Sequence, residues 1–249
     1  MIIFSHRGLG FNEEENSIEG YRKALMEGFS IEIDVQKTKD NQIVISHDAN
    51  LKRTKNIDMK ISESSLEDIK HLIPSFNEIL NILSKSKQEQ LMAIHIKDKK
   101  QESLLRILCN QITEEKIENR CFVFDVTKAG RDLIRSINPN IKVAFSVGEK
   151  VYGDTIYLWE DVCNEDFDIV WWDEWVEGTL YKSENLKLLK ECGKVVYAIS
   201  PELHQIGDCP PARLNRIKNV WDNLIAMNVD GLCTDYPLDL RGTLLKISL

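Results

Sequence analysis

The hydrophobic residues of the chain are grouped in short apolar runs, and stretches of helical periodicity lie between these runs. The runs have the length of strands and occur at residues 1–5, 30–35, 42–46, 91–97, 121–126, 142–147, 168–172, 194–200 and 231–234. Apolar residues recur at helical spacing near residues 18–25, 64–73, 75–83, 101–112, 129–137, 184–192 and 211–227. This alternation predicts an α/β protein with a parallel sheet covered by helices.

The number of these units bears on the architecture. About eight strand–helix units in 249 residues favour a closed TIM (β/α)8 barrel over an open doubly wound sheet. No linker, low-complexity tract or change in composition divides the chain. We therefore expect a single domain over residues 1–249.

Composition and charge narrow the classes of partner and the compartment. The formal net charge of −8 argues against a nucleic-acid partner or an anionic membrane surface, which usually call for a basic patch. The opening residues, Met-Ile-Ile-Phe-Ser-His, lack the features of a signal peptide, and no apolar run approaches membrane-spanning length. The six cysteines are scattered without C-x-x-C or zinc-like spacing, so we expect buried free thiols. These features predict a cytoplasmic protein without an integral membrane segment.

In a TIM barrel, active-site residues gather where the strands end. The polar and aromatic residues at those positions are His6, Arg7, Glu32, Asp34, His47, His95, Lys97, Trp171, Trp172, residues 200–204 and Asp235. The selection rests on the strand pattern alone, yet it collects several histidines and a pair of carboxylates. We therefore take this set as the candidate active site.

Glu32 and Asp34 lie two residues apart in an apolar strand, which places both side chains on the same face. Two adjacent carboxylates are costly to bury unless a cation lies between them. Oxygen ligands of this kind suit a hard divalent cation such as Mg²⁺ or Ca²⁺. The alternative is structural, with one carboxylate facing solvent or paired with a nearby lysine.

His6 and His47 come shortly before and shortly after this carboxylate strand. Imidazole titrates near neutral pH, so the two residues suit a general acid and a general base flanking a scissile bond. Arg7 and Lys97 add positive charge suited to a phosphate oxyanion. Hydrogen-bonded structural histidines and local ion pairs are the alternatives. Together, a cation site, basic side chains and two histidines indicate phosphoryl chemistry.

Linked motifs near the start of the chain resemble the N-terminal signature of the glycerophosphodiester phosphodiesterases. That signature reads H-R-G, E-N-T, E-x-D-V, T-x-D, H-D and L-x-R-T in order. The matching segments, with spacing that fits throughout, are His6-Arg7-Gly8, Glu15-Asn16-Ser17, residues 32–35, residues 38–40, His47-Asp48 and residues 51–54. Weaker matches follow at residues 73–78 and 229–237. Several motifs in the right order are far more specific than one short pattern.

The resemblance implies a TIM-barrel phosphodiesterase that splits small glycerophosphodiesters into sn-glycerol 3-phosphate and an alcohol. It implies that Glu32 and Asp34 bind a divalent metal and that Arg7 contacts phosphate. It also implies that His6 and His47 act as general acid and base. In the usual mechanism of the family, a neighbouring substrate hydroxyl attacks phosphorus, and water then opens the cyclic phosphate. A polymer with glycerol-phosphate links or a phospholipid-like diester is an alternative substrate.

One position departs from the family pattern. The third strand of the family commonly ends E-x-K, where the Glu is a third metal carboxylate, whereas this chain reads His95-Ile96-Lys97. As a metal ligand, His95 would remove one negative charge and make Mn²⁺ or Zn²⁺ more plausible than in the family. Alternatively, His95 hydrogen-bonds Asp34 or a water and binds no metal. That alternative would fit a non-catalytic or altered-specificity barrel that binds phosphodiesters.

Residues at the ends of the later strands are candidates for the substrate pocket. Trp171 and Trp172 are adjacent, so strand alternation sends them to opposite sides, and we expect at least one to pack between barrel and helices. An aromatic face on the inner side suits a glycerol or head-group pocket. Glu202 and His204 follow the seventh strand and are candidates for the barrel mouth. The sequence leaves the oligomeric state open.

Overall fold

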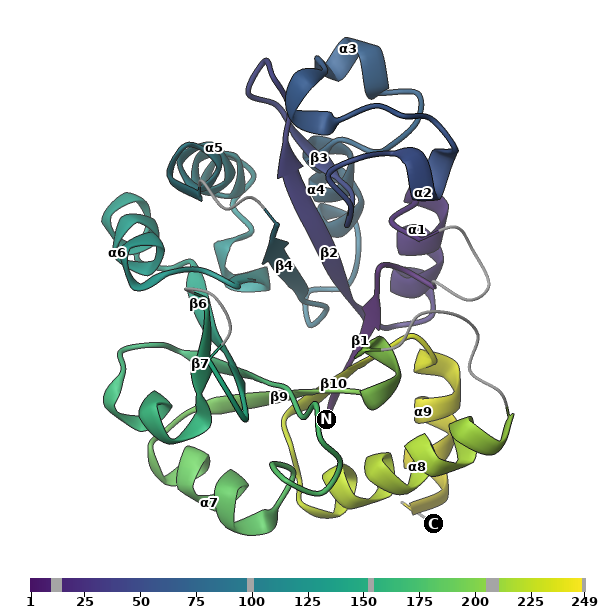
Figure 1. Cartoon of the computed structure of the whole chain (residues 1–249), viewed down its shortest axis with the longest axis vertical. Coiled ribbons are helices and arrows are strands. Elements are labelled where there is room, and N and C mark those ends of the chain that lie inside the picture. The colour runs from purple at the N-terminus through teal and green to yellow at the C-terminus, as the bar shows by residue number, and fades with distance from the viewer. Residues whose placement is uncertain (10–14, 98–100, 152–154, 205–210, 248–249) are drawn as a thin grey trace.

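Eight parallel strands close into a ring, which confirms the expected TIM barrel (Figure 1). The computed structural model describes residues 1–9, 15–97, 101–151, 155–204 and 211–247. In ring order, the strands are β1 (Ile2–His6), β2 (Ser30–Lys37), β4 (Met92–Ile96), β5 (Cys121–Phe124), β6 (Lys142–Gly148), β8 (Ile169–Trp172), β9 (Val195–Ile199) and β10 (Gly231–Thr234). β10 pairs with β1, and β1 pairs with β2, so the first and last strands complete the closure.

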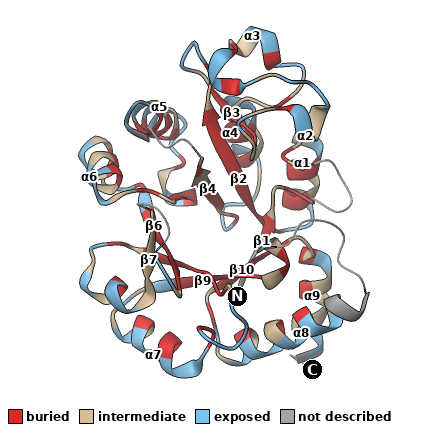
Figure 2. Cartoon of the chain, in the orientation of Figure 1, coloured by how far each residue is buried: buried red, intermediate tan, exposed pale blue. Residues whose placement is uncertain are grey.

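Strand side chains alternate between two hydrophobic layers. The inside of the barrel holds Phe4, Ala93, Phe122, Phe124, Ala144, Ile169, Trp171, Tyr197, Ile199 and Cys233. Neighbouring positions such as Ile94, Val123 and Trp172 belong to the larger core outside the ring. Figure 2 shows this core as buried strands facing the buried sides of the helices. Both faces of each strand are therefore dry, which explains why the strands read as continuous Ile, Val, Ala and Phe runs.

Helices cover the outside of the ring (Figure 1). The longer ones are α1 (Ile18–Met26), α4 (Phe76–Ser84), α5 (Gln101–Glu114), α6 (Lys128–Ile137), α7 (Ser183–Glu191), α8 (Pro211–Ala226) and α9 (Pro237–Ile247). Hydroxyl side chains cap several of their N-termini. Ser75 and Glu78 form a reciprocal capping box at α4, and Ser17 accepts a hydrogen bond from the Gly20 amide at α1. Short 3₁₀ helices lie at η2 (Glu118–Arg120), η3 (Trp159–Asn164) and η4 (Pro201–His204).

The apolar run at 42–46 is a strand but not a strand of the ring. It forms β3 (Ile43–Ile45), which pairs antiparallel with β2. The turn between Thr38 and Gln42 is far too short for the crossover that a parallel pair needs, so the chain folds back as a hairpin. Short elements follow β3 in an excursion at one end of the barrel, namely α2 (Lys52–Lys55), η1 (Ile61–Glu63) and α3 (Leu66–Ile69). The helix expected at 64–73 is therefore shortened to the four residues of α3.

The sequence pattern also missed elements near the C-terminal half. A short strand, β7 (Ile156–Leu158), pairs parallel with β6 beside the ring, and α9 packs on β1 and β10. The hydrophobic periodicity of α9 is weak because polar residues interrupt it.

Among the described residues, no helix is both long and apolar enough to cross a bilayer.

The expectation of free thiols is wrong for two cysteines. Cys163 of η3 and Cys192, just after α7, form a disulfide, with Cα atoms 5.4 Å apart. The two residues are 29 positions apart in sequence, and only the packing of η3 against α7 brings them together. Cys109, Cys121 and Cys233 are buried free thiols, as expected. Cys209 lies outside the described residues.

Candidate active site

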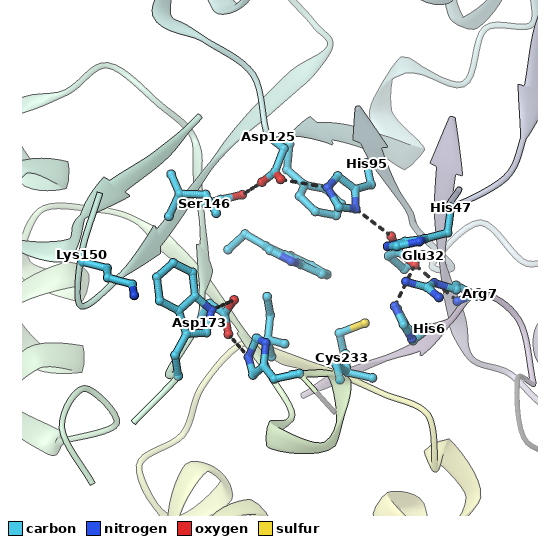
Figure 3. A pocket seen from close by; sticks show the side chains of 17 residues that line it. His6, Arg7, Glu32, His47, His95, Asp125, Ser146, Lys150, Asp173 and Cys233 are labelled. Carbon is cyan, nitrogen blue, oxygen red and sulfur yellow. Dashed lines mark hydrogen bonds and ion pairs between the residues drawn. The ribbon is translucent and has the colours of Figure 1, made fainter. Parts of the chain in front are cut away.

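The register of three ring strands aligns the side chains that the strand-end rule selected. His6 of β1 is paired with Glu32 of β2, and Asp34 of β2 is paired with His95 of β4. The strands are parallel, so these residues lie near the carboxyl end of the barrel at similar heights. Figure 3 shows His6, Glu32 and His95 converging on one cavity.

This cavity has a volume of about 450 Å³ and carries different chemistry on its two sides. His6, Arg7, Glu32 and His47 lie together on one side, and Lys150 and Asp173 lie on the other (Figure 3). His95, Asp125 and Ser146 connect the two sides. The remaining lining residues are Phe124, Ile156, Trp171, Trp175, Ile199, Leu203, His204 and Cys233.

The carboxylate pair is almost completely removed from solvent. Glu32 is 1% exposed and Asp34 is 0% exposed. Burial, together with the charge of Asp34, raises the pKa of Glu32. Burial acts in the same direction on Asp34, but His95, Arg7 and Lys97 beside it hold the pKa of that carboxyl well below its usual range. The site therefore keeps at least one buried negative charge.

Arg7 serves this pair through both its backbone and its side chain. Its amide donates to Glu32 Oε2 at 3.3 Å, and its Nε lies 3.0 Å from Asp34 Oδ2. The backbone reaches this position because Arg7 adopts a left-handed φ of +52° and Gly8 follows with a φ of +89°. A Cβ at Gly8 would lie 3.0 Å from the backbone of Gly20, so only glycine fits. This geometry explains the H-R-G motif.

His6 is held in place by a residue from the last strand. Its Nδ1 lies 2.8 Å from Asp235 Oδ1, and its Nε2 lies 3.9 Å from Glu32 Oε2. Burial acts to lower the pKa of His6, but the hydrogen bond to Asp235 and the charge of Glu32 raise it above the usual value. The amide of Asp235 in turn donates to Glu202 Oε1 at 3.2 Å.

His47 comes from the hairpin and not from a ring strand. The antiparallel course of β3 returns the chain to the level of Asp34, where the Ser46 amide donates to the Asp34 carbonyl. His47 Nδ1 lies 2.6 Å from Asp48 Oδ1, and burial lowers the pKa of His47. Arg53 Nε donates to Asp48 Oδ2 at 2.5 Å.

A chain of ion pairs connects Arg7 with the His47–Asp48 pair. Arg53 contacts Glu15, and Glu15 Oε2 lies 3.1 Å from Arg7 NH1. Asn16, the next residue, donates from Nδ2 to Asp34 Oδ2 at 3.3 Å. The E-N-S and L-x-R-T segments therefore act as braces for Arg7, Asp34 and the His47–Asp48 pair.

Three side chains are arranged so that they can hold a cation. Ligand atoms of Glu32, Asp34 and His95 all lie within 4.8 Å of one another. His95 Nδ1 is 3.1 Å from Asp34 Oδ1 and 3.8 Å from Glu32 Oε1. Asp34 Oδ1 is buried and accepts no hydrogen bond of normal geometry from the described residues. A buried carboxylate oxygen facing an imidazole nitrogen fits a divalent cation.

Basic groups lie beside the candidate cation site of Glu32, Asp34 and His95. Lys97 Nζ lies 3.7 Å from Asp34 Oδ1. Burial acts to lower the pKa of His95, but Asp125 and Asp34 raise it to about 9. Without a metal, His95 is therefore an imidazolium that neutralises part of the carboxylate charge.

The structure separates the four candidates for the substrate pocket. Trp171 lines the cavity, stacked on Phe124 with ring centroids 4.6 Å apart. Trp172 does not line it, because strand alternation turns its side chain into the outer core. Glu202 is also absent from the lining; it is buried behind the site, where Ser200 and Thr234 donate hydrogen bonds to it. His204 lines the cavity instead and contacts Asp173 Oδ1 at 2.5 Å.

A model of the glycerophosphoryl diester phosphodiesterase family matches residues 6–191. The chain belongs to this family. It is a phosphodiesterase, as the sequence motifs predicted. The non-catalytic alternative finds no support in the comparisons with known proteins.

Individual relatives agree with this assignment over nearly the whole length of the phosphodiesterase. A glycerophosphodiester phosphodiesterase of Bacillus altitudinis is 25% identical over 252 residues, which cover 94% of each chain. A glycerophosphodiester phosphodiesterase structure from Agrobacterium tumefaciens has a TM-score of 0.72 at 17% identity and covers 96% of this chain and 98% of that chain. An Oleispira antarctica phosphodiesterase, in complex with the product sn-glycerol-3-phosphate, has a TM-score of 0.78 at 17% identity, with 98% and 96% covered. Both structures share the barrel fold.

Several residues of the cavity were not singled out from the sequence of this phosphodiesterase. Asp125 follows β5 directly and Asp173 follows β8 directly. Asp235, which the strand-end rule did select, follows β10 in the same way. Each of these three carboxylates contacts a histidine. Taking the residue just past the run 168–172 would have found Asp173, whereas Asp125 lies inside the predicted run 121–126, which extends two residues beyond β5.

Proposed function

We propose that this phosphodiesterase hydrolyses small glycerophosphodiesters to sn-glycerol 3-phosphate and an alcohol, with His6 and His47 as acid–base catalysts. The observation that carries the proposal is that these two histidines and Glu32 line the same cavity (Figure 3). Each is held through Nδ1 by its own carboxylate, Asp235 or Asp48. The relatives support the substrate class, because the Bacillus altitudinis protein is named for it and the Oleispira antarctica structure contains the product.

The environments of the two histidines support different roles. A raised pKa favours the protonated form of His6, so His6 suits the general acid that protonates the leaving alcohol oxygen. A lowered pKa keeps His47 neutral, so His47 suits the general base. In the first step, His47 takes the proton from a neighbouring substrate hydroxyl as its oxygen attacks phosphorus. The phosphorus–alcohol bond breaks, and the cyclic phosphate is then opened by water with the roles reversed.

The residues that would hold a divalent cation are Glu32, Asp34 and His95. When bound there, a divalent cation supplies positive charge that stabilises the phosphoryl oxygens as charge builds on them. Arg7 and Lys97 add fixed positive charge at the same place and suit the phosphate of the substrate. Phe124 and Trp171, which line the cavity, offer apolar faces to the carbon atoms of the substrate.

The test is release of glycerol 3-phosphate from a panel of glycerophosphodiesters that differ in the alcohol. The purified protein is stripped with a chelator and assayed after adding Mg²⁺, Ca²⁺, Mn²⁺ or Zn²⁺ in turn. We expect turnover with at least one ion and none in the stripped protein. Absence of product with every ion, from protein with a normal unfolding transition, would contradict the proposal.

Two substitutions test the roles of the histidines. His6→Ala and His47→Ala should each lower kcat by about 100- to 10,000-fold, the range of general acid–base catalysis. His71→Ala is the matched control, because His71 is exposed and outside the cavity lining. Near-normal turnover in either active-site variant would show that the assigned histidine is not a catalyst.

A further inference from the structure

Both ring nitrogens of His95 face carboxylates. Nδ1 faces Asp34 and Glu32, and Nε2 lies 2.8 Å from Oδ2 of Asp125, which directly follows the neighbouring strand β5 (Figure 3). Asp125 is itself anchored, because Ser146 donates its hydroxyl to Oδ1. A chain of hydrogen bonds from Ser146 through Asp125 to His95 thus runs along the cavity towards Glu32 and Asp34.

We propose that Asp125 is a positioning residue that presents His95 Nδ1 as a nitrogen ligand, making this a site for a transition-metal ion such as Mn²⁺ or Zn²⁺. The inference rests on the cation site in the proposed function and goes beyond it by naming the ion class and the residue that selects it. Asp125 touches neither the ion nor the substrate in this scheme; it acts through His95.

The hydrogen bond from Nε2 decides which nitrogen can bind a metal. Only the neutral form of the imidazole can bind a metal, and that form carries one N–H. Of the two ring nitrogens, only Nε2 makes a hydrogen bond of normal geometry to a carboxylate, so the hydrogen is held at Nε2. The lone pair is then on Nδ1, which faces Glu32 and Asp34. A carboxylate behind a ligating histidine is the common arrangement in metalloproteins, where it fixes the tautomer and strengthens the ligand.

The ring of His95 is also held against rotation. It stacks on Phe124 with centroids 4.6 Å apart and an interplanar angle of 23°. A ring flip would put Cδ2 in the place of Nδ1 and Cε1 in the place of Nε2, so Asp34 and Asp125 would both face carbon. Asp125 has little freedom to follow, because its backbone adopts a left-handed φ of +56° and its carboxylate is held by Ser146. Nδ1 is therefore fixed on the metal side before any ion arrives.

The donor set argues for the class of ion. Mg²⁺ and Ca²⁺ prefer oxygen ligands, and their binding depends on the number of carboxylates. Here one of three donors is nitrogen, and Lys97 lies 3.7 Å from Asp34, which weakens the attraction for a purely ionic partner. Imidazole suits transition-metal ions such as Zn²⁺, and Mn²⁺ stands at the weak end of the affinity order for such sites. A nitrogen ligand aligned by Asp125 offsets the missing charge for these ions and not for Mg²⁺.

The experiment measures metal binding by the full-length, chelator-stripped protein without substrate. Isothermal titration should show tighter binding of Mn²⁺ or Zn²⁺ than of Mg²⁺. D125N should weaken Mn²⁺ and Zn²⁺ binding by about 10- to 100-fold, the usual cost of losing such a partner, and leave Mg²⁺ binding nearly unchanged. D173N is the matched control, because Asp173 forms the same kind of pair with His204 across the cavity. It should leave all affinities unchanged.

A spectroscopic measurement reports the ligand directly. Pulsed electron paramagnetic resonance of the Cu²⁺-loaded protein should show nitrogen coupling from an imidazole, and His95→Glu should abolish it. His6→Ala and His47→Ala should each retain it, which excludes the two other histidines beside Glu32. If D125N fails to fold, Ser146→Ala removes the anchor of Asp125 and should weaken Mn²⁺ and Zn²⁺ binding in the same direction.

The outcomes separate this inference from the proposed function. Tight Mg²⁺ binding with turnover, and no imidazole coupling, would overturn the inference and leave the function standing. If D125N binds Mn²⁺ and Zn²⁺ as tightly as the wild type does, Asp125 does not position His95 as a metal ligand. Failure to bind or use any ion would overturn both, and would mean that His95 is an imidazolium bridging Asp34 and Asp125.

Discussion

His6 and Asp235 are 229 residues apart in sequence, yet His6 Nδ1 lies 2.8 Å from Asp235 Oδ1. The contact exists because β10 pairs with β1 and closes the ring. Asp235 is in turn held by Glu202, buried between Ser200 and Thr234. Closure of the barrel therefore also brings Asp235 into place to orient His6, the proposed general acid.

Replacing Asp235 tests this relationship. Asp235→Asn should lower kcat by about 100-fold, the lower end of what a general acid contributes. Without the carboxylate, the pKa of His6 should fall from its raised value. An acid must be protonated to act, so the alkaline limb of the rate profile should move to lower pH. The measurement is kcat against pH, with Asp239→Asn as the control, because Asp239 pairs with Lys218 elsewhere.

The acidic limb of the pH–rate profile should report the titration of His47. Burial lowers the pKa of His47, so the base should become active at a pH below about 6.5, the usual value for imidazole. Asp48 favours the protonated form, so Asp48→Asn should lower the pKa of His47 and shift the limb to still lower pH. The check is kcat/KM between about pH 4.5 and 8. A limb above the usual value, or a shift to higher pH in the variant, would contradict the assignment.

Two glycine substitutions test the backbone at the H-R-G turn. Gly8→Ala should destabilise the protein by about 1–3 kcal/mol, because Gly8 has a φ of +89° and a Cβ there would press on the Gly20 backbone. Gly242→Ala is the contrasting variant, because a Cβ there meets nothing within 4 Å inside α9. It should stabilise by up to about 1 kcal/mol. Urea unfolding of both variants gives the comparison, and equal effects would show that the turn is not constrained.

The disulfide gives a prediction that is independent of the cavity. Under oxidising conditions, the Cys163–Cys192 bond should add about 3 kcal/mol to the free energy of unfolding, as expected for a loop of this length. Cys163→Ser should remove that increment, and a reducing agent should lower the stability of the wild type but not of the variant. Thiol counting by mass spectrometry checks the bond, and no change on reduction would show that it does not form.

Much of the architecture was readable from the chain because ring strands are buried on both faces. Such strands must be apolar throughout, so runs like 121–126 and 231–234 stand out. The pattern could not tell β3 from a ring strand, since β3 is equally apolar and only its tight turn reveals the hairpin. It also could not pair Cys163 with Cys192, because a distance between distant segments is not encoded in hydrophobic periodicity.

The candidate site was predicted in part, and for reasons that differ between residues. His6, Glu32 and His95 were found because parallel strands bring their ends to one edge. Strand alternation sends the side chain of Trp172 into the outer core and not into the cavity. Glu202 is buried behind the site, where it accepts hydrogen bonds. Asp125 was overlooked because the predicted run 121–126 enclosed it, although β5 ends at Phe124. Its meaning depends on the histidine that it faces.

The hairpin position of His47 has a consequence for how this enzyme can vary. The ring closes through β1, β2 and β4 without β3, so the position of His47 depends on the excursion and on its contacts with the site, such as the Arg53–Glu15–Arg7 ion pairs, and not on barrel closure. Changes in the length or sequence of the excursion between β2 and β4 can move His47 relative to His6 without disturbing barrel closure. New specificities in such a barrel can therefore arise by remodelling one appendage while the cation site stays fixed.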